Sequence, residues 1–156
     1  MKNTAFVLTG LLSVMSGVTT SVYAAEEGRA GYECMPANPA TAGYFRIENY
    51  VQNTSLTTDL VVTCPVTKNS SFQNFEGSVD VFNNTGRTLT CTRTLYAGSY
   101  GRVRVDTLTT TVAARLTFPK ATQNGVLVVG YKCTLPYQGS ANWLSAGIQS
   151  YVSNDY

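Results

Sequence analysis

The chain has 156 residues, of which 13% are charged and none is histidine, and its formal net charge at pH 7 is +2. So small a positive charge does not match the basic surface of a nucleic-acid-binding protein. The lack of histidine excludes a Ser–His–Asp triad and a zinc site that uses histidine. We therefore expect neither a nucleic-acid partner nor a cofactor.

Residues 1–24 have the pattern of a secretory signal peptide. Lys2 supplies a basic start, residues 5–18 form an apolar run, and small residues lead to a cleavage site after Ala24. The apolar run is shorter than the roughly 20 residues that a membrane helix needs, and no later segment is long enough. We predict a secreted or periplasmic protein without a transmembrane segment, whose single mature domain is 25–156.

The mature chain reads as strands separated by turns. Segments rich in Val, Leu, Thr and Tyr recur about every ten residues, with Gly, Asn or Pro between them. After an irregular segment at 31–43, the predicted strands are 44–53, 58–66, 77–83, 87–96, 101–106, 109–119, 126–136 and 142–153. A short helical turn at Trp143–Ile148 is an alternative for the last one. The pattern predicts an all-β fold, an antiparallel β-sandwich of jelly-roll or immunoglobulin-like type.

The cysteines are expected to form disulfides. There are four, Cys34, Cys64, Cys91 and Cys133, an even number in a chain expected to be exported to an oxidising compartment. No C-x-x-C pair suggests a metal or redox site, and no histidine is present to activate a thiolate. Three pairings are open. We favour Cys34–Cys64, which ties the irregular N-terminal segment to a strand, and Cys91–Cys133, which joins two strands.

Short motifs around the cysteines carry a resemblance. They are C-x-P at 34–36, V-T-C-P at 62–65, T-L-T-C at 88–91 and Y-K-C-T-L-P at 131–136, followed by I-Q-S-Y at 148–151. Together they resemble a loose group of small exported bacterial four-cysteine β-proteins of unknown function. The resemblance implies a bacterial, exported β-domain held by disulfides. It brings no catalytic or ligand-binding residues.

Aromatic residues flank two bends and are candidates for ligand binding. Tyr96 and Tyr100 bracket one bend, and Tyr137 and Trp143 flank another. Aromatic rings on the surface of a sandwich can stack on sugar rings while their polar atoms form hydrogen bonds. The alternative is that these rings pack in the core or at its rim.

Arginines form a second candidate site. Arg102 and Arg104 alternate with valines, so in a regular strand both would point to one face. Arg93 and Arg115 are expected on neighbouring strands. Clustered guanidinium groups suit sulfate, phosphate or carboxylate. The alternative is an edge strand that charge protects from aggregation.

Carboxylates give weaker candidates. Glu48, Asp80 and Asp106 are expected in or near strands, and a glycosidase needs two such groups facing each other across a cleft. No spacing singles out a pair. Asp80, Asn83 and Asn84 could contribute to a calcium site, but such residues are commoner as turn formers. We expect no metal.

The sequence therefore favours an exported, non-enzymatic interaction module whose partner is a glycan or an anionic surface polymer. The alternative is a structural subunit of a surface appendage or coat. A carboxylate-based hydrolase is the least favoured function.

Overall fold

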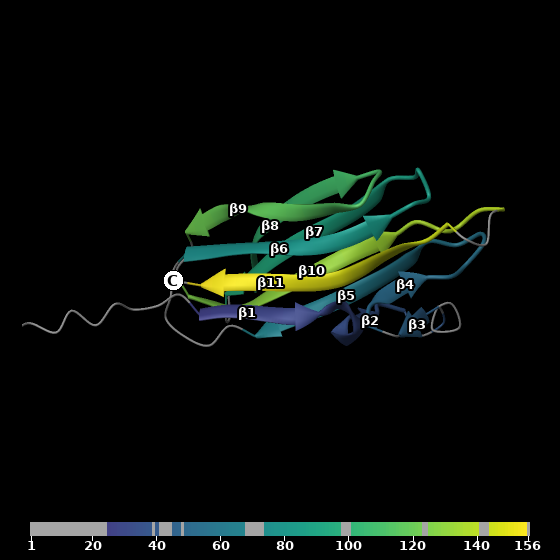
Figure 1. Cartoon of the computed structure of the whole chain (residues 1–156). Helices are drawn as coiled ribbons and strands as arrows, with labels where there is room; N and C mark the ends of the chain where they lie inside the picture. Colours follow the sequence, from purple (N-terminus) through teal and green to yellow (C-terminus); the bar gives the residue numbers. More distant parts are fainter. Residues whose placement is uncertain are drawn as a thin grey trace, which may run out of the picture.

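The computed structural model describes residues 25–38, 40, 45–47, 49–67, 74–97, 101–122, 125–140 and 144–155. The predicted signal peptide, Glu48, Tyr100 and Trp143 lie outside this part of the chain. Two antiparallel sheets pack face to face, which confirms the predicted β-sandwich (Figure 1). Within the described residues, no helix has the length and apolarity needed to cross a membrane.

The first sheet is built around the last strand of the chain. β11 pairs with β6 along one edge, and its other edge pairs first with β4 and then with β1. The sheet order is β3-β4-β11-β6-β9 with β1 beside β11. Its strands are β1 (Ala25–Ala30), β3 (Phe45–Ile47), β4 (Val51–Asn53), β6 (Asn74–Asn83), β9 (Ala114–Thr122) and β11 (Ala146–Asp155).

The second sheet has β10 and β7 at its centre. Its order is β2-β5-β10-β7-β8, so β8 forms one edge and the short β2 the other. Its strands are β2 (Met35–Pro36), β5 (Leu60–Thr67), β7 (Leu89–Ala97), β8 (Gly101–Thr110) and β10 (Val126–Leu135). Figure 1 shows this sheet behind the first one.

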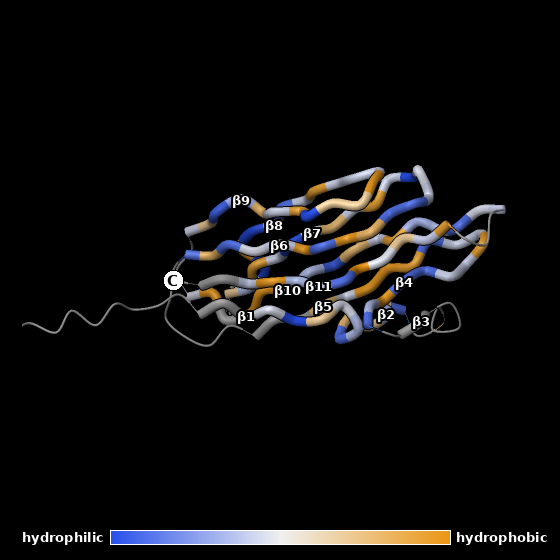
Figure 2. The backbone as a smooth tube through the Cα atoms, viewed as in Figure 1, coloured by the Kyte–Doolittle hydropathy of each residue, from blue (hydrophilic) through white to orange (hydrophobic). Residues whose placement is uncertain are grey.

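Side chains alternate between the core and the outside along the central strands. Every second residue of β6 and β7 is buried, as the alternating sequence predicts. Figure 2 shows hydrophilic and hydrophobic residues interspersed along the strands. The aromatic ring of Tyr131 crosses the core from β10, and its hydroxyl donates a hydrogen bond of 3.0 Å to the Val152 carbonyl. A Cβ at Gly77 would collide with that hydroxyl, so only glycine fits there.

Both disulfides have the pairing favoured from the sequence, Cys34–Cys64 and Cys91–Cys133. Cys91 and Cys133 stand directly opposite each other on β7 and β10, with Cα atoms 4.1 Å apart. All four cysteines are fully buried. The disulfides therefore belong to the core of the sandwich, and no free cysteine is found among the described residues.

Strand boundaries differ from the prediction in several places, among them β9, which begins at Ala114 and not at residue 109. The predicted strand 44–53 is two short strands, β3 and β4, which pair with each other in a tight antiparallel hairpin. β8 continues to Thr110, because the alternation persists through Leu108, which packs against the core. β1 was not predicted, since its sequence, AEEGRA, lacks the apolar alternation of a strand. β11 forms the last predicted strand, and it begins at Ala146.

Candidate functional site

A groove with a volume of about 570 Å³ runs over the outer face of the second sheet. This volume lies within the usual range of small-molecule and cofactor sites, about 300–1,000 Å³. Its walls and floor come from β5, β7, β8 and β10, so the groove spans most of the sheet. The side chains that point into it are Thr63, Thr90, Thr92, Thr94, Tyr96, Arg102, Val105, Val128, Lys132 and Thr134.

Threonines form the floor of the groove. Thr90, Thr92 and Thr94 occupy alternate positions of β7 and therefore share the outer face. Thr92 Oγ1 lies 3.2 Å from Thr107 Oγ1 of β8, so these two hydroxyls share a hydrogen bond. Each threonine presents a hydroxyl that can donate and accept beside an apolar methyl group. Such a surface can contact both the hydroxyls and the C–H groups of a sugar.

Tyr96 forms an apolar wall near one end of the groove. Its side chain is 43% exposed, and it lies between Val128 of β10 and Arg102 of β8. After Val128, the next position of β10 on the outer face is Gly130. A Cβ atom at Gly130 would lie 3.6 Å from the Tyr96 ring. The ring therefore leans over a position without a side chain. This leaves one face of an aromatic ring beside the threonine floor.

The prediction that Arg102 and Arg104 share a face is wrong. The pairing of β7 with β8 shifts between Leu95 and Tyr96, so that Leu95 opposes Arg104 and Tyr96 opposes Arg102. The extra residue is Val103, which packs against the core. This bulge breaks the two-residue alternation, and one arginine points outward while the other lies on the inner side.

Arg93 is buried within the sandwich, so it does not join a surface cluster of arginines. Its side chain is fully buried, and its Nη2 donates to Asp106 Oδ2 and to the Pro119 carbonyl, both at 2.6 Å. Its Nη1 has no hydrogen-bond partner among the described residues. Asp106 also binds Arg104 at 3.0 Å. Burial works to raise the pKa of Asp106, but hydrogen bonds from Arg104 and Arg93 outweigh it, so the pKa lies below its ordinary value.

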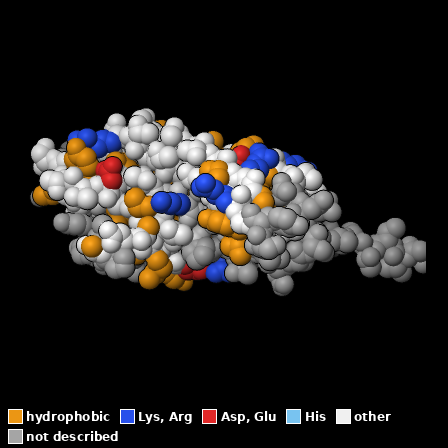
Figure 3. Space-filling view, turned by 180° about the vertical axis from the view of Figure 1, so that it is seen from behind, with side chains coloured by type: hydrophobic (Ala, Val, Ile, Leu, Met, Phe, Trp, Pro, Cys, Tyr) orange, Lys and Arg blue, Asp and Glu red, His pale blue; other side chains and the backbone are white. Residues whose placement is uncertain are grey.

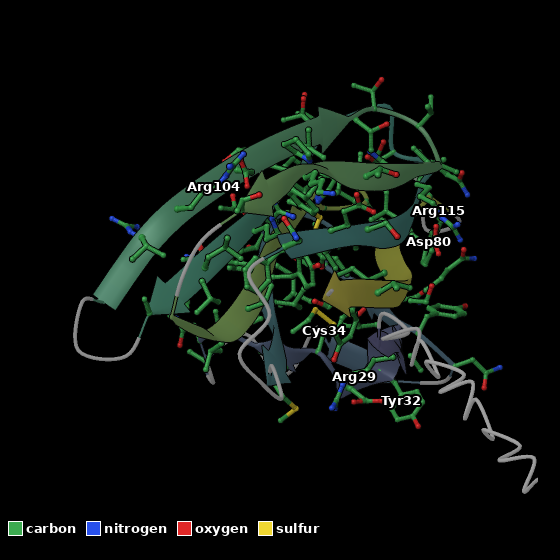
Figure 4. The ribbon with its side chains drawn as sticks, turned by 90° about the vertical axis from the view of Figure 1, so that its left-hand side faces the viewer. Arg29, Tyr32, Cys34, Asp80, Arg104 and Arg115 are labelled. Carbon is green, nitrogen blue, oxygen red and sulfur yellow. A yellow bond between two sulfur atoms is a disulfide. The ribbon has the colours of Figure 1, made fainter. Side chains whose placement is uncertain are left out.

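Arg115 lies on the opposite side of the molecule, on the outer face of the first sheet. It binds Asp80 with contacts of 2.7 and 3.0 Å, and Ser150 donates to the same carboxylate. Figure 4 shows Asp80 and Arg115 side by side, with Arg104 on the other side of the view. The hydrogen bond from Arg115 is the main reason that the pKa of Asp80 lies below its ordinary value.

Of the calcium candidates Asp80, Asn83 and Asn84, Asn83 forms a turn. Asn83 Oδ1 accepts hydrogen bonds from the amide and hydroxyl of Thr85, and its amide donates to the Arg87 and Thr110 carbonyls. The carboxylate of Asp80 forms an ion pair with Arg115. Within the described ranges, no three His, Cys, Asp or Glu side chains gather as a metal site would require.

The predicted aromatic residues do not all meet. Tyr96 pairs near the beginning of β10, whereas Tyr137 comes two residues after β10 ends, so the two lie at opposite ends of the sheet. Tyr137 carries the guanidinium of Arg87 over its ring, at 4.0 Å from the ring centroid. The predictions for Tyr100 and Trp143 fall outside the described residues.

The groove contains residues that the sequence analysis did not select. Its threonines, Gly130 and Lys132 were assigned only to strands. The T-x-T-x-T alternation at 90–94 was the signal that could have identified the floor, because it places three hydroxyls on one face of a strand. Of the predicted ligand-binding residues that the structure describes, Tyr96 and Arg102 line the groove, and Arg104 and Tyr137 do not.

The fold is shared with solved structures of known proteins. BiXyn10A CBM1, a carbohydrate-binding module solved without ligand, aligns with a TM-score of 0.52 at 10% identity, over 83% of this chain and 96% of that one. A second match is the GH26-CBM35 β-(1,4)-mannanase of Podospora anserina, with a TM-score of 0.50 at 12% identity. The alignment covers 84% of this chain but only 28% of the mannanase.

The chain has the β-sandwich fold of carbohydrate-binding modules. At these identities the likeness concerns the fold alone. No protein-family model matches the sequence, and the search of curated proteins found no match.

Proposed function

We propose that the protein is an exported, non-enzymatic module that binds a polysaccharide chain along the groove of the second sheet. The observation that carries the proposal is the groove itself, about 570 Å³ in volume and lined by threonine hydroxyls and one exposed aromatic ring. A groove that crosses four strands suits an extended chain. The fold shared with a carbohydrate-binding module supports the same function.

The state of Asp80 and Asp106, the two candidate carboxylates that the structure describes, supports a role in binding over catalysis. A general acid in glycoside hydrolysis needs a raised pKa, and it faces a second carboxylate across the substrate. Asp80 and Asp106 each have a lowered pKa and bind arginines. Neither lines the groove. The two buried disulfides support export, because disulfides persist mainly in oxidising compartments.

The test measures binding to a panel of soluble and insoluble polysaccharides. Replacing both Thr92 and Thr94 by valine keeps the shape of the floor but removes two hydroxyls. A hydrogen bond contributes about 1 kcal/mol net, so we expect the double variant to lose roughly 1–3 kcal/mol of binding free energy. Tyr96→Ala should cost about 1 kcal/mol through the lost ring contact.

Thr117→Val is the matched control. Thr117 is an exposed threonine of β9, on the first sheet, and it is outside the groove. Its replacement should leave binding unchanged. If no polysaccharide binds, or if the control weakens binding as much as the groove variants, the proposed function is wrong. Concentration-dependent polymers in gel filtration, without polysaccharide binding, would favour the structural subunit instead.

A further inference from the structure

Among the described residues that line it, the groove has two positive charges and no negative one. Arg102 and Lys132 are both exposed, and no Asp or Glu of the described part of the chain lines the groove with them. Asp106 lies four residues beyond Arg102 in β8, but the bulge turns it to the inner face, where Arg93 and Arg104 hold it. The carboxylate nearest to Arg102 in sequence is therefore unavailable to the groove.

Arg102 differs from the other arginines whose side chains the structure describes. Arg29 pairs with Glu33, Arg87 lies over Tyr137, and Arg115 pairs with Asp80. Arg93 and Arg104 share Asp106. Neither Arg102 nor Lys132 forms an ion pair or a side-chain hydrogen bond with any described residue. In Figure 3, basic side chains lie near the middle of the visible face, among hydrophobic and uncharged ones.

The register places the two cations apart along the groove. Lys132 of β10 is beside Thr92, and Arg102 of β8 is beside Tyr96. The two cations therefore lie two strand spacings apart, with β7 between them, and four residues apart along the strand direction. With usual strand spacings, their Cα atoms are about 17 Å apart. Side chains that stand away from the sheet then meet two separate anionic groups more readily than one. Thr94, Gly130 and Tyr96 lie between them.

From this arrangement we infer that the polysaccharide is acidic, and that Arg102 and Lys132 each bind a carboxylate or sulfate group on different sugar residues of one chain. Guanidinium and ammonium groups form charge-assisted hydrogen bonds with both kinds of anion. The threonine floor and the Tyr96 ring contact the uncharged parts of the sugars between them. This inference rests on the proposed function and adds the charge of the ligand to it.

The experiment compares polymers that differ only in charge. Polygalacturonate is measured against its fully methyl-esterified form, and dextran sulfate against dextran, by affinity electrophoresis at low and high salt. We expect the protein to bind at least one charged polymer about tenfold or more tightly than its neutral counterpart, and salt to weaken that binding. Preferential binding of polygalacturonate identifies carboxylate as the group recognised, and preferential binding of dextran sulfate identifies sulfate.

The variants connect the preference to the two cations. Arg102→Gln and Lys132→Gln together should reduce affinity for the charged polymer about tenfold or more and flatten its salt dependence, so that the preference over the neutral polymer is lost. Lys132→Arg retains the charge and should preserve the preference. Arg115→Gln removes a cation on the opposite face, outside the groove, and should change neither affinity.

Each contrary outcome has its own meaning. Equal binding of charged and neutral polymers overturns the acidic ligand but leaves the proposed function standing. A charge preference that survives the Arg102 and Lys132 double substitution overturns the assignment to these residues. Single-stranded DNA that binds as tightly as the best polysaccharide, and loses affinity in the same variant, identifies a nucleic acid instead. No binding of any polysaccharide overturns the proposed function itself.

Discussion

The two faces of the second sheet use the same strands for different purposes. On β7, Cys91, Arg93 and Leu95 point inward, and each is fully buried. Thr90, Thr92 and Thr94 alternate with them and point into the groove. The inward arginine has its carboxylate within the protein, whereas Arg102 on the outer face has none among the described residues. The buried side chains of the inner face therefore determine stability, and the exposed side chains of the outer face are available to the proposed ligand.

The strongest way to test this difference is to remove the charge that Arg93 needs. Asp106→Asn leaves a buried guanidinium without its carboxylate, and removing one partner of a buried ion pair costs about 3–5 kcal/mol. Urea unfolding should show a loss of this size. Asp80→Asn is the control, because Arg115 in that pair is 66% exposed, and surface pairs contribute about 1 kcal/mol or less. Equal losses in the two variants would contradict the contrast between buried and exposed pairs.

The same pair should make stability depend on pH. Asp106 has a pKa below its ordinary value of 3.8, so the native state binds fewer protons than the unfolded state at acidic pH. The pair's contribution is fully present above that value and is lost as pH falls through the lower, native pKa. The measurement is thermal unfolding between about pH 5 and about pH 2, which spans the titration of the Asp106 carboxyl. As the pH falls, the melting temperature should decline less for Asp106→Asn than for the unmodified protein. A steeper decline in the variant would contradict this assignment.

Substitutions on the outer face should have the smallest effect on stability. Thr92→Val keeps a β-branched side chain, and Lys132→Gln removes a charge that has no described partner, so each should change the free energy of unfolding by about 0.5 kcal/mol or less. Urea unfolding checks this, and it shows whether lost binding reflects the groove or the fold. A loss of several kcal/mol for Lys132→Gln would mean that its charge supports the sandwich.

Much of the fold was predictable because its signals are local. Alternation in 77–83 and 87–96 and the turn residues between segments predicted the sandwich, and the even number of cysteines in a chain expected to be exported predicted the disulfides. No local signal in the sequence predicted which strands pair with each other. β1 forms because β11 offers it an open edge, and this depends on residues more than a hundred positions away.

The site was less predictable for a physical reason. Regular alternation predicted that Arg102 and Arg104 share a face, but the bulge at Val103 separates them, and no residue type in the sequence marks that bulge. The groove depends on which strands are neighbours, since Lys132 and Thr92 become adjacent only through the pairing of β10 with β7. Arg93 could have been recognised as buried, because it alternates with Leu89, Cys91 and Leu95.

The place of β11 in the first sheet has a consequence for how the chain acquires its structure. β11 pairs with β1, β4 and β6, and all three precede it in the chain. Chains emerge from synthesis with the N-terminal end first, so these earlier strands lack a common neighbour until residues 146–155 arrive. Nearly all of the pairing in this sheet then joins distant parts of the sequence, a topology that slows folding. Until then β4 can pair only with β3, β6 only with β9, and β1 with no strand, so each keeps an edge without its partner. Such open strand edges are prone to aggregation, which favours chaperone binding to the unfinished chain.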